Sequence, residues 1–184
     1  MNPETDGRLQ NAAFYLRAAE FFAERGSDQH KALYRAFHDR FYRAFGHGYL
    51  VSKVIPYRGS FLPVSFCRSA AYPARGTILL FGGFDSLIEE FYVIWRYFTD
   101  AGYNVIVFEG PGQGGARLLH GVASDHDWEK PVTAVLDHYQ LEQAALIGIS
   151  MGGYWAIRAA AYEPRIQQVV SWSPVYDWLE QVPP

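Results

Sequence analysis

A serine stands at the centre of the pattern G-x-S-x-G, formed by Gly148, Ser150 and Gly152. The apolar run 144–148 before it predicts a buried strand, and residues 151–162 after it predict a helix. A serine at the apex of a sharp strand-to-helix turn presents its hydroxyl for attack on a carbonyl carbon. Side chains two positions before and after the apex would collide, which accounts for the glycines. The alternative is a structural Gly-Ser turn with no catalytic role.

The same turn should also supply hydrogen-bond donors for an oxyanion. The helix beginning at Met151 directs its first N–H groups toward the serine. A second donor is expected from the loop after the strand 77–81, where we favour the N–H of Phe84 over that of Gly83. Losing one such donor typically costs roughly 3–4 kcal/mol of transition-state stabilisation. An ordinary tight turn is the alternative for this loop.

A base and an acid are needed to activate the serine, and in this kind of site they follow it in the chain. All six histidines precede Ser150, and the acids after it are Glu163, Asp177 and Glu180. We therefore expect residues 1–184 to be the N-terminal part of a longer hydrolase, inactive alone, with the ending YDWLEQVPP opening a lid insertion. Open alternatives are His120 or His126 as base and Glu109 or Asp177 as acid.

A second glycine-rich loop, EGPGQGG, contains G-x-G-x-x-G at Gly110, Gly112 and Gly115. A dinucleotide site is disfavoured because Pro111 removes an N–H, no amphipathic helix is expected within the loop, and it follows a later strand. We expect a loop that shapes the active site, with Glu109 accepting hydrogen bonds from it.

Aromatic residues near the serine suggest a small-molecule substrate with an apolar or aromatic portion. Candidate site-lining residues are Gly83, Tyr154 and Trp172, with Phe84, Tyr176 and Trp178 as further candidates; for each aromatic ring taken separately, core packing is the favoured interpretation. Cys67 is expected to be an inert buried thiol. No C-x-x-C or H-E-x-x-H pattern predicts a metal, and no cofactor is expected.

Composition excludes several classes of protein. The formal net charge of −3 argues against a nucleic-acid binder, and an apolar content of 49% argues against disorder. No apolar run approaches the ~18 residues of a membrane helix, and no signal segment is apparent. With a single cysteine, no disulfide scaffold can form. We expect a soluble, cytoplasmic protein with no membrane partner.

The hydrophobic pattern predicts an α/β protein in two parts. Residues 1–48 are expected to form a helical hairpin, with a stop and cap at Gly26 and Ser27 and an apolar stripe including Phe37 and Phe41. That stripe leaves a homodimer as an open alternative. Residues 49–184 are expected to form a mostly parallel sheet covered by helices, with an antiparallel hairpin at one edge. Ser86 and Glu89 predict a capping box for the helix after the strand 77–81.

These motifs resemble the α/β-hydrolase superfamily, and within it the branch around 2,6-dihydroxy-pseudo-oxynicotine hydrolase and related esterase-like or C–C-bond hydrolases. The resemblance covers about residues 77–184 and is carried by LLFGGFDS, FEGPGQG, DWEKPVTAVLDH, GISMGGYWAIRAAAYEPRI and VVSWSPVYDW. It implies an α/β-hydrolase fold, C-terminally incomplete, with Ser150 as nucleophile and N–H groups of Met151 and near Phe84 as oxyanion donors. It implies cleavage of an ester or of an activated C–C bond next to a ketone. Alternatives are a non-catalytic binding module and a peptidase or acyltransferase on the same fold.

Overall fold

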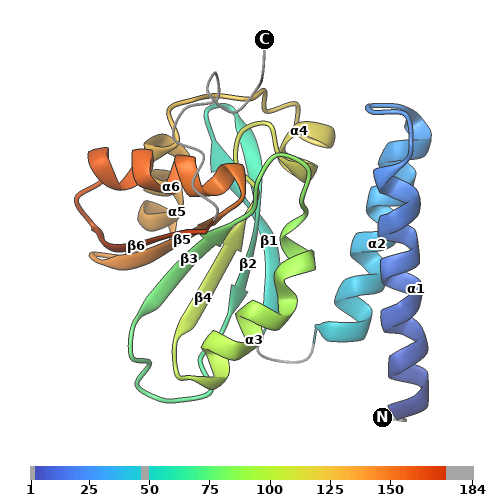
Figure 1. Ribbon diagram of the computed structural model, residues 1–184, viewed down its shortest axis with the longest axis horizontal. Coiled ribbons are helices and arrows are strands. Elements are labelled where there is room, and N and C mark those ends of the chain that lie inside the picture. Colours follow the sequence, from blue (N-terminus) through green and yellow to red (C-terminus); the bar gives the residue numbers. More distant parts are fainter. Residues whose placement is uncertain (1–2, 47–49, 173–184) are drawn as a thin grey trace. The chain divides into compact units, whose positions relative to one another are not determined.

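The computed structural model describes residues 3–46 and 50–172 (Figure 1). The chain divides into two compact units between Leu50 and Val51. The elements, in chain order, are α1 (Pro3–Phe21), α2 (Asp28–Phe45), β1 (Leu50–Tyr57), β2 (Ser60–Cys67), β3 (Thr77–Phe81), the 3-10 helix η1 (Ile88–Phe91), α3 (Tyr92–Asp100), β4 (Asn104–Phe108), α4 (Gly114–Leu118), α5 (Glu129–His138), β5 (Ala144–Ile149), α6 (Met151–Tyr162) and β6 (Ile166–Trp172).

The first unit contains the predicted helical hairpin. Gly26 lies in the turn with φ of 80°, a conformation that glycine adopts without a steric penalty. Ser27 is the N-cap of α2, and its side chain accepts a hydrogen bond from the His30 N–H at 3.0 Å. The stop and the cap are therefore where the sequence predicts them.

The apolar stripe of α2 packs against α1. The Phe14 ring contacts Phe37, Phe41 and Phe45, with ring centroids 6.4–6.5 Å apart. Phe37 and Phe41 are completely buried, whereas Leu33 is only half-buried. The four-residue spacing of the aromatic rings thus gives this unit a core of its own.

The second unit is built on a sheet with strand order β1-β2-β4-β3-β5-β6 among the described residues. Strands β3, β4, β5 and β6 pair in parallel, and β2 pairs antiparallel with β4. Arg58 and Gly59, with φ of 48° and 78°, form the turn between β1 and β2, as a tight hairpin turn requires. The predicted mixed sheet with an antiparallel hairpin at one edge is confirmed.

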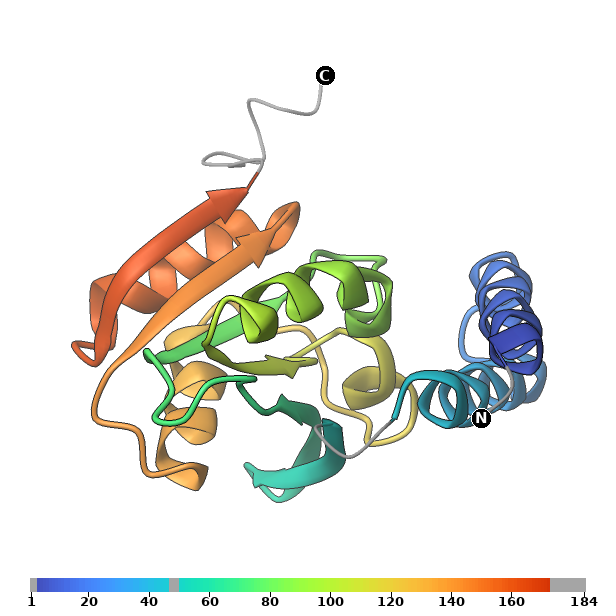
Figure 2. The ribbon, with the colours of Figure 1, turned by 90° about the horizontal axis from the view of Figure 1, so that it is seen from below.

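Helices cover both faces of the sheet (Figure 2). On one face, α5 and α6 contribute Trp128, Val132 and Ala156 to a core with alternate strand residues such as Leu79 and Phe81. Helix α3 covers the opposite face (Figure 2), and its Trp95 is buried. Fully buried strands are nearly continuous in apolar residues because neither face meets water.

The segment after β3 differs from the prediction. Ser86 does not cap the helix: its Oγ accepts a hydrogen bond from the Gly83 N–H at 2.9 Å. Glu90, one residue beyond the predicted Glu89, accepts from the Leu87 N–H at 2.7 Å. The helix opens as the 3-10 turn η1 before α3, with Leu87 in place of Ser86 at the N-cap.

The glycine loop after β4 also differs from the prediction. A short helix, α4, begins inside it at Gly114. Its five residues are too few to show an amphipathic period in the sequence. None of the helices in the described ranges is both long and apolar enough to span a bilayer.

Candidate active site

Ser150 occupies a strained backbone conformation between β5 and α6. Its φ and ψ are 60° and −131°, a region that residues with a side chain rarely adopt. Its N–H donates to the Trp172 carbonyl oxygen at 2.9 Å, and its own carbonyl accepts from the Gly153 N–H at 2.8 Å. Bonds on both sides hold the apex, and the Ser150 side chain is exposed.

The flanking glycines are required by backbone contacts. A Cβ at Gly148 would overlap the carbonyl oxygen of Gly152. A Cβ at Gly152 would lie 2.5 Å from the carbonyl oxygen of Gly82, on the loop after β3. The turn is therefore closed against itself and against the neighbouring loop, which is the steric reason for the G-x-S-x-G spacing.

The loop after β3 lies directly against the serine. A Cβ at Gly83 would lie 2.7 Å from the Ser150 Cβ, 2.8 Å from its Oγ and 3.1 Å from the Met151 nitrogen. Met151 is the first residue of α6, where an N–H has no partner within the helix. Ser150, Met151 and Gly83 thus converge, and the absence of a side chain at Gly83 leaves space beside the hydroxyl.

Gln113 is a residue of this site that the sequence reasoning missed. Its amide nitrogen donates to the carbonyl oxygens of Gly82 and Gly83, both at 2.8 Å. Its amide oxygen accepts from the Gly110 N–H at 2.8 Å. The only sequence signal is its place inside the glycine loop, which gives no indication of the distant partner.

Glu109 is buried beneath the same glycine loop. Its Oε2 accepts from the Gly115 N–H at 2.6 Å, in line with the expected role as an acceptor for the loop. A Cβ at Gly114 would overlap this carboxylate. The N-terminus of α4 therefore faces a carboxylate that would repel a phosphate, which argues against the dinucleotide alternative.

The aromatic residues predicted near the site are exposed. The exposed fractions are 52% for Phe84, 36% for Tyr154 and 54% for Trp172, so none of these rings is buried by the described residues. Tyr176, Asp177 and Trp178 lie outside the described residues, as does the rest of the ending 173–184. The roles of the three exposed rings as site-lining residues stay predictions.

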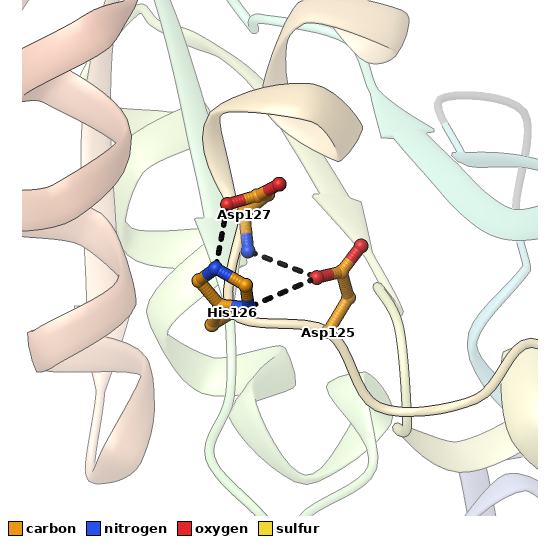
Figure 3. A group of neighbouring side chains, drawn as sticks. All are labelled: Asp125, His126 and Asp127. Atoms are coloured by element: carbon orange, nitrogen blue, oxygen red, sulfur yellow. Dashed lines mark hydrogen bonds and ion pairs between the residues drawn. The ribbon is translucent and has the colours of Figure 1, made fainter.

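In the described residues, the two upstream loop histidines contact groups other than Ser150. The His120 ring packs on Phe61, with centroids 5.7 Å apart. His126 contacts the carboxylates of Asp125 and Asp127 at 3.4 and 3.0 Å (Figure 3). His120 thus packs on β2, and His126 is engaged within its own loop.

Asp125, His126 and Asp127 bring their ligand-type atoms within 4.8 Å of one another. Cationic side chains already balance this group: Arg58 contacts Asp125 at 2.8 Å, and Arg158 contacts Asp127 at 2.7 Å. A hydrogen bond from Lys130 also lowers the pKa of Asp127. The cluster is therefore explained as an exposed ion-pair network without a metal.

Cys67 is 1% exposed, and burial raises the pKa of its thiol to about 12. Because the thiolate is the reactive form, this cysteine is an inert core residue, as expected.

Taken together, a parallel sheet, a strained serine at a strand-to-helix turn and a glycine loop facing it define the α/β-hydrolase class. The chain belongs to the family described as serine aminopeptidase, S33, whose model matches residues 72–184.

Curated relatives agree with this assignment. The chain is 34% identical to hydrolase acrC of Aspergillus aculeatus, over 95% of this chain and 47% of that protein. It is 36% identical to alpha/beta hydrolase psoB of Aspergillus fumigatus, over 85% of this chain and 41% of that protein. The chain thus spans about half the length of these relatives.

Solved structures show the same fold. The crystal structure of 2,6-dihydroxy-pseudo-oxynicotine hydrolase aligns with a TM-score of 0.81 at 22% identity, covering 96% of this chain and 52% of that one. AbyA5 aligns with a TM-score of 0.76 at 23% identity, covering 90% of this chain and 48% of that one. The α/β-hydrolase fold expected from the sequence is confirmed.

Proposed function

We propose that this chain carries the nucleophile of a serine hydrolase that cleaves a carboxylic ester or an activated C–C bond next to a ketone. The observation that carries the proposal is the strained backbone of Ser150, held with its side chain exposed against Gly83 and the start of α6. Strain of this kind costs about 1–3 kcal/mol and persists only where surrounding structure enforces it. A turn with no chemistry gives no reason to maintain it.

Each group of the site has a role in the proposed reaction. The Ser150 Oγ attacks the carbonyl carbon as a base takes its proton, and the carbonyl π electrons move onto the oxygen. The N–H groups of Met151 and Phe84 hold that oxyanion. Collapse of the intermediate breaks the bond to the leaving group, which takes the proton from the base. Water then releases the acyl group from Ser150 and restores the hydroxyl.

Phe84 is the favoured second donor because of how the Gly83 N–H is used. That N–H donates to the Ser86 Oγ at 2.9 Å. Its hydrogen bond would have to break before it could bind an oxyanion.

The base and the acid are part of the same proposal. All six histidines precede Ser150 in the chain, and in the described ranges the loop histidines contact other groups. We propose that a histidine outside residues 1–184 serves as base. The substrate we propose is a small molecule with an apolar or aromatic portion, which the exposed Phe84, Tyr154 and Trp172 would contact.

Fluorophosphonate labelling tests the nucleophile in the full natural chain that contains residues 1–184. We expect labelling of the wild type and none of Ser150→Ala. The control is Ser69→Ala, because Ser69 lies beside the start of β4, at the opposite end of the sheet, where its N–H donates to Asn104. Labelling that persists in Ser150→Ala would refute the assignment.

A second candidate function is peptide cleavage, and the family description favours it, since it names a serine aminopeptidase. The same serine would attack an amide carbonyl and the leaving group would be an amine. Mass analysis of products from an ester, a β-diketone and an N-terminal peptide amide separates these reactions. A chain that binds apolar ligands without turning over any of them would instead be a binding module.

A further inference from the structure

We infer that Gln113 is a positioning residue that sets the orientation of the second oxyanion donor, the N–H of Phe84. This inference rests on the proposed function, because it assigns Gln113 a part in the same site. Gln113 does not touch the reacting atoms. It acts through the loop after β3.

The amide of Gln113 is fully used and fixed in one orientation. It is 2% exposed, so water does not compete for its hydrogen bonds. Its oxygen accepts from Gly110 on its own loop, and its nitrogen donates to the carbonyls of Gly82 and Gly83. A primary amide has two N–H donors, and these two carbonyls take both.

The two carbonyls determine where two N–H groups point. In a trans peptide the C=O and the N–H point in opposite directions, and both peptides here are trans. The carbonyl of Gly82 shares its peptide with the Gly83 N–H, which donates to Ser86. The carbonyl of Gly83 shares its peptide with the Phe84 N–H. Holding the Gly83 carbonyl at Gln113 therefore turns the Phe84 N–H away from Gln113.

The serine lies beside this fixed peptide. The position of a Cβ at Gly83 is 2.7 Å from the Ser150 Cβ and 3.1 Å from the Met151 nitrogen. A rotation of the Gly83–Phe84 peptide would therefore move the second donor relative to the hydroxyl and the first donor. Oxyanion donors must lie 2.7–3.1 Å from the developing charge, so a small rotation removes the contact.

The loop after β3 must be held by residues outside it, because its own two glycines restrict its backbone little. Gly82 and Gly83 have no side chains to restrict their backbone, and glycine loses the most conformational freedom on ordering. β3 lies between β4 and β5 in the sheet. The loop after β3 is thus held from one side by Gln113 after β4, and from the other by Gly152 after β5.

The test compares Gln113→Met with the wild type in the full natural chain. Methionine has a similar length but cannot donate to either carbonyl. We expect kcat for p-nitrophenyl butyrate to fall about 30-fold with KM within about twofold, somewhat less than the loss of a whole donor. We expect affinity for 1,1,1-trifluoro-4-phenylbutan-2-one, which forms a tetrahedral adduct with serine, to fall equally. Affinity for 4-phenylbutan-2-one, which forms no stable adduct, should not change.

Glu163→Gln is the matched control, since Glu163 is also buried and hydrogen-bonded but lies at the far end of α6. It should lower thermal stability and leave kcat unchanged. If Gln113→Met does not fold, Gln113→Leu is measured in its place, because a leucine side chain also cannot donate to the carbonyls.

Two results would overturn the inference. One is an unchanged kcat in the folded Gln113 variant, and the other is a loss of kcat that is fully explained by a smaller folded fraction of the variant. If the wild type itself is not labelled at Ser150, the proposed function fails instead. The two failures are therefore distinguishable.

Discussion

Two glycine-rich turns flank β3, and they need glycine for different reasons. In the β5–α6 turn, a Cβ at Gly148 or Gly152 would meet backbone carbonyl atoms. In the β4–α4 turn, a Cβ at Gly110 would instead meet the Trp128 side chain, 2.5 Å from its ring. The backbone cannot move there without disrupting the strand or the helix, whereas a side chain can shift at a cost in packing energy. Gly148 and Gly152 in the first turn are therefore required by the chain path, whereas Gly110 in the second is required by side-chain packing.

The two turns also present their central side chains differently. Ser150 is exposed at the apex of the first, whereas Gln113 in the second is buried and hydrogen-bonded. Both contact the loop after β3. The β5–α6 turn thus exposes a serine hydroxyl, whereas the β4–α4 turn holds the loop after β3 in place.

The largest expected effect is that of Gly148→Ala. The added methyl group overlaps the Gly152 carbonyl, so the turn must open. We expect a loss of about 4 kcal/mol in the free energy of unfolding, or failure to fold. Urea denaturation measures it. A loss below about 1 kcal/mol would mean that the backbone of the first turn can shift to admit a side chain.

Gly110→Ala should cost less. The Trp128 ring it meets stacks on Trp155, with centroids 4.2 Å apart, so it can shift only against resistance. We expect about 2.5 kcal/mol of destabilisation in the same urea assay, from overpacking. Relief by the second substitution Trp128→Phe would confirm that side-chain packing, and not the backbone path, requires this glycine.

Lowering the pH should weaken the interaction of Glu163 with Arg165 at the far end of α6. A hydrogen bond from Arg165 lowers the pKa of Glu163 from 4.5 to about 2. Because the folded-state pKa is the lower one, the stabilisation is present above pH 4.5 and is lost as the pH falls toward 2. We expect about 2 kcal/mol of the acid-dependent loss to disappear in Glu163→Gln, measured by urea denaturation at pH 6 and pH 3. Equal pH slopes in both proteins would contradict this.

Ser150→Gly should give the smallest effect, and a stabilising one. Glycine adopts a φ of 60° and ψ of −131° without strain, so we expect a gain of about 1 kcal/mol with no labelling. Ser150→Ala keeps the Cβ and should not gain. A melting temperature that is equal in both variants would show that the apex is not strained.

Much of the fold could be predicted from the sequence. Continuous apolar runs gave the parallel strands, and α6 lies over the predicted residues 151–162 because Gly148 and Ser150 mark its start and Pro164 follows its end. The capping box at Ser86 was wrong, since the serine hydroxyl bonds the Gly83 N–H behind it. The limits of α6 and the capping box were both predicted from local spacing. Local spacing does not show which of two backbone partners a hydroxyl takes.

The candidate site, like the fold, could be predicted from the sequence only in part. The roles of Ser150, Met151 and Phe84 stay predictions, although the structure brings Gly83 against the first two. The hydrogen bonds from Gln113 join residues 30 positions apart, and no periodicity reports such a contact.

By itself, the sequence determined where strands and helices alternate and where a serine would stand at a sharp turn, because steric and hydrophobic patterns act between near neighbours. Only the tertiary structure decided that the turns after β4 and β5 hold the β3 loop between them. That decision depends on the strand order, which places β3 between two strands that come later in the chain.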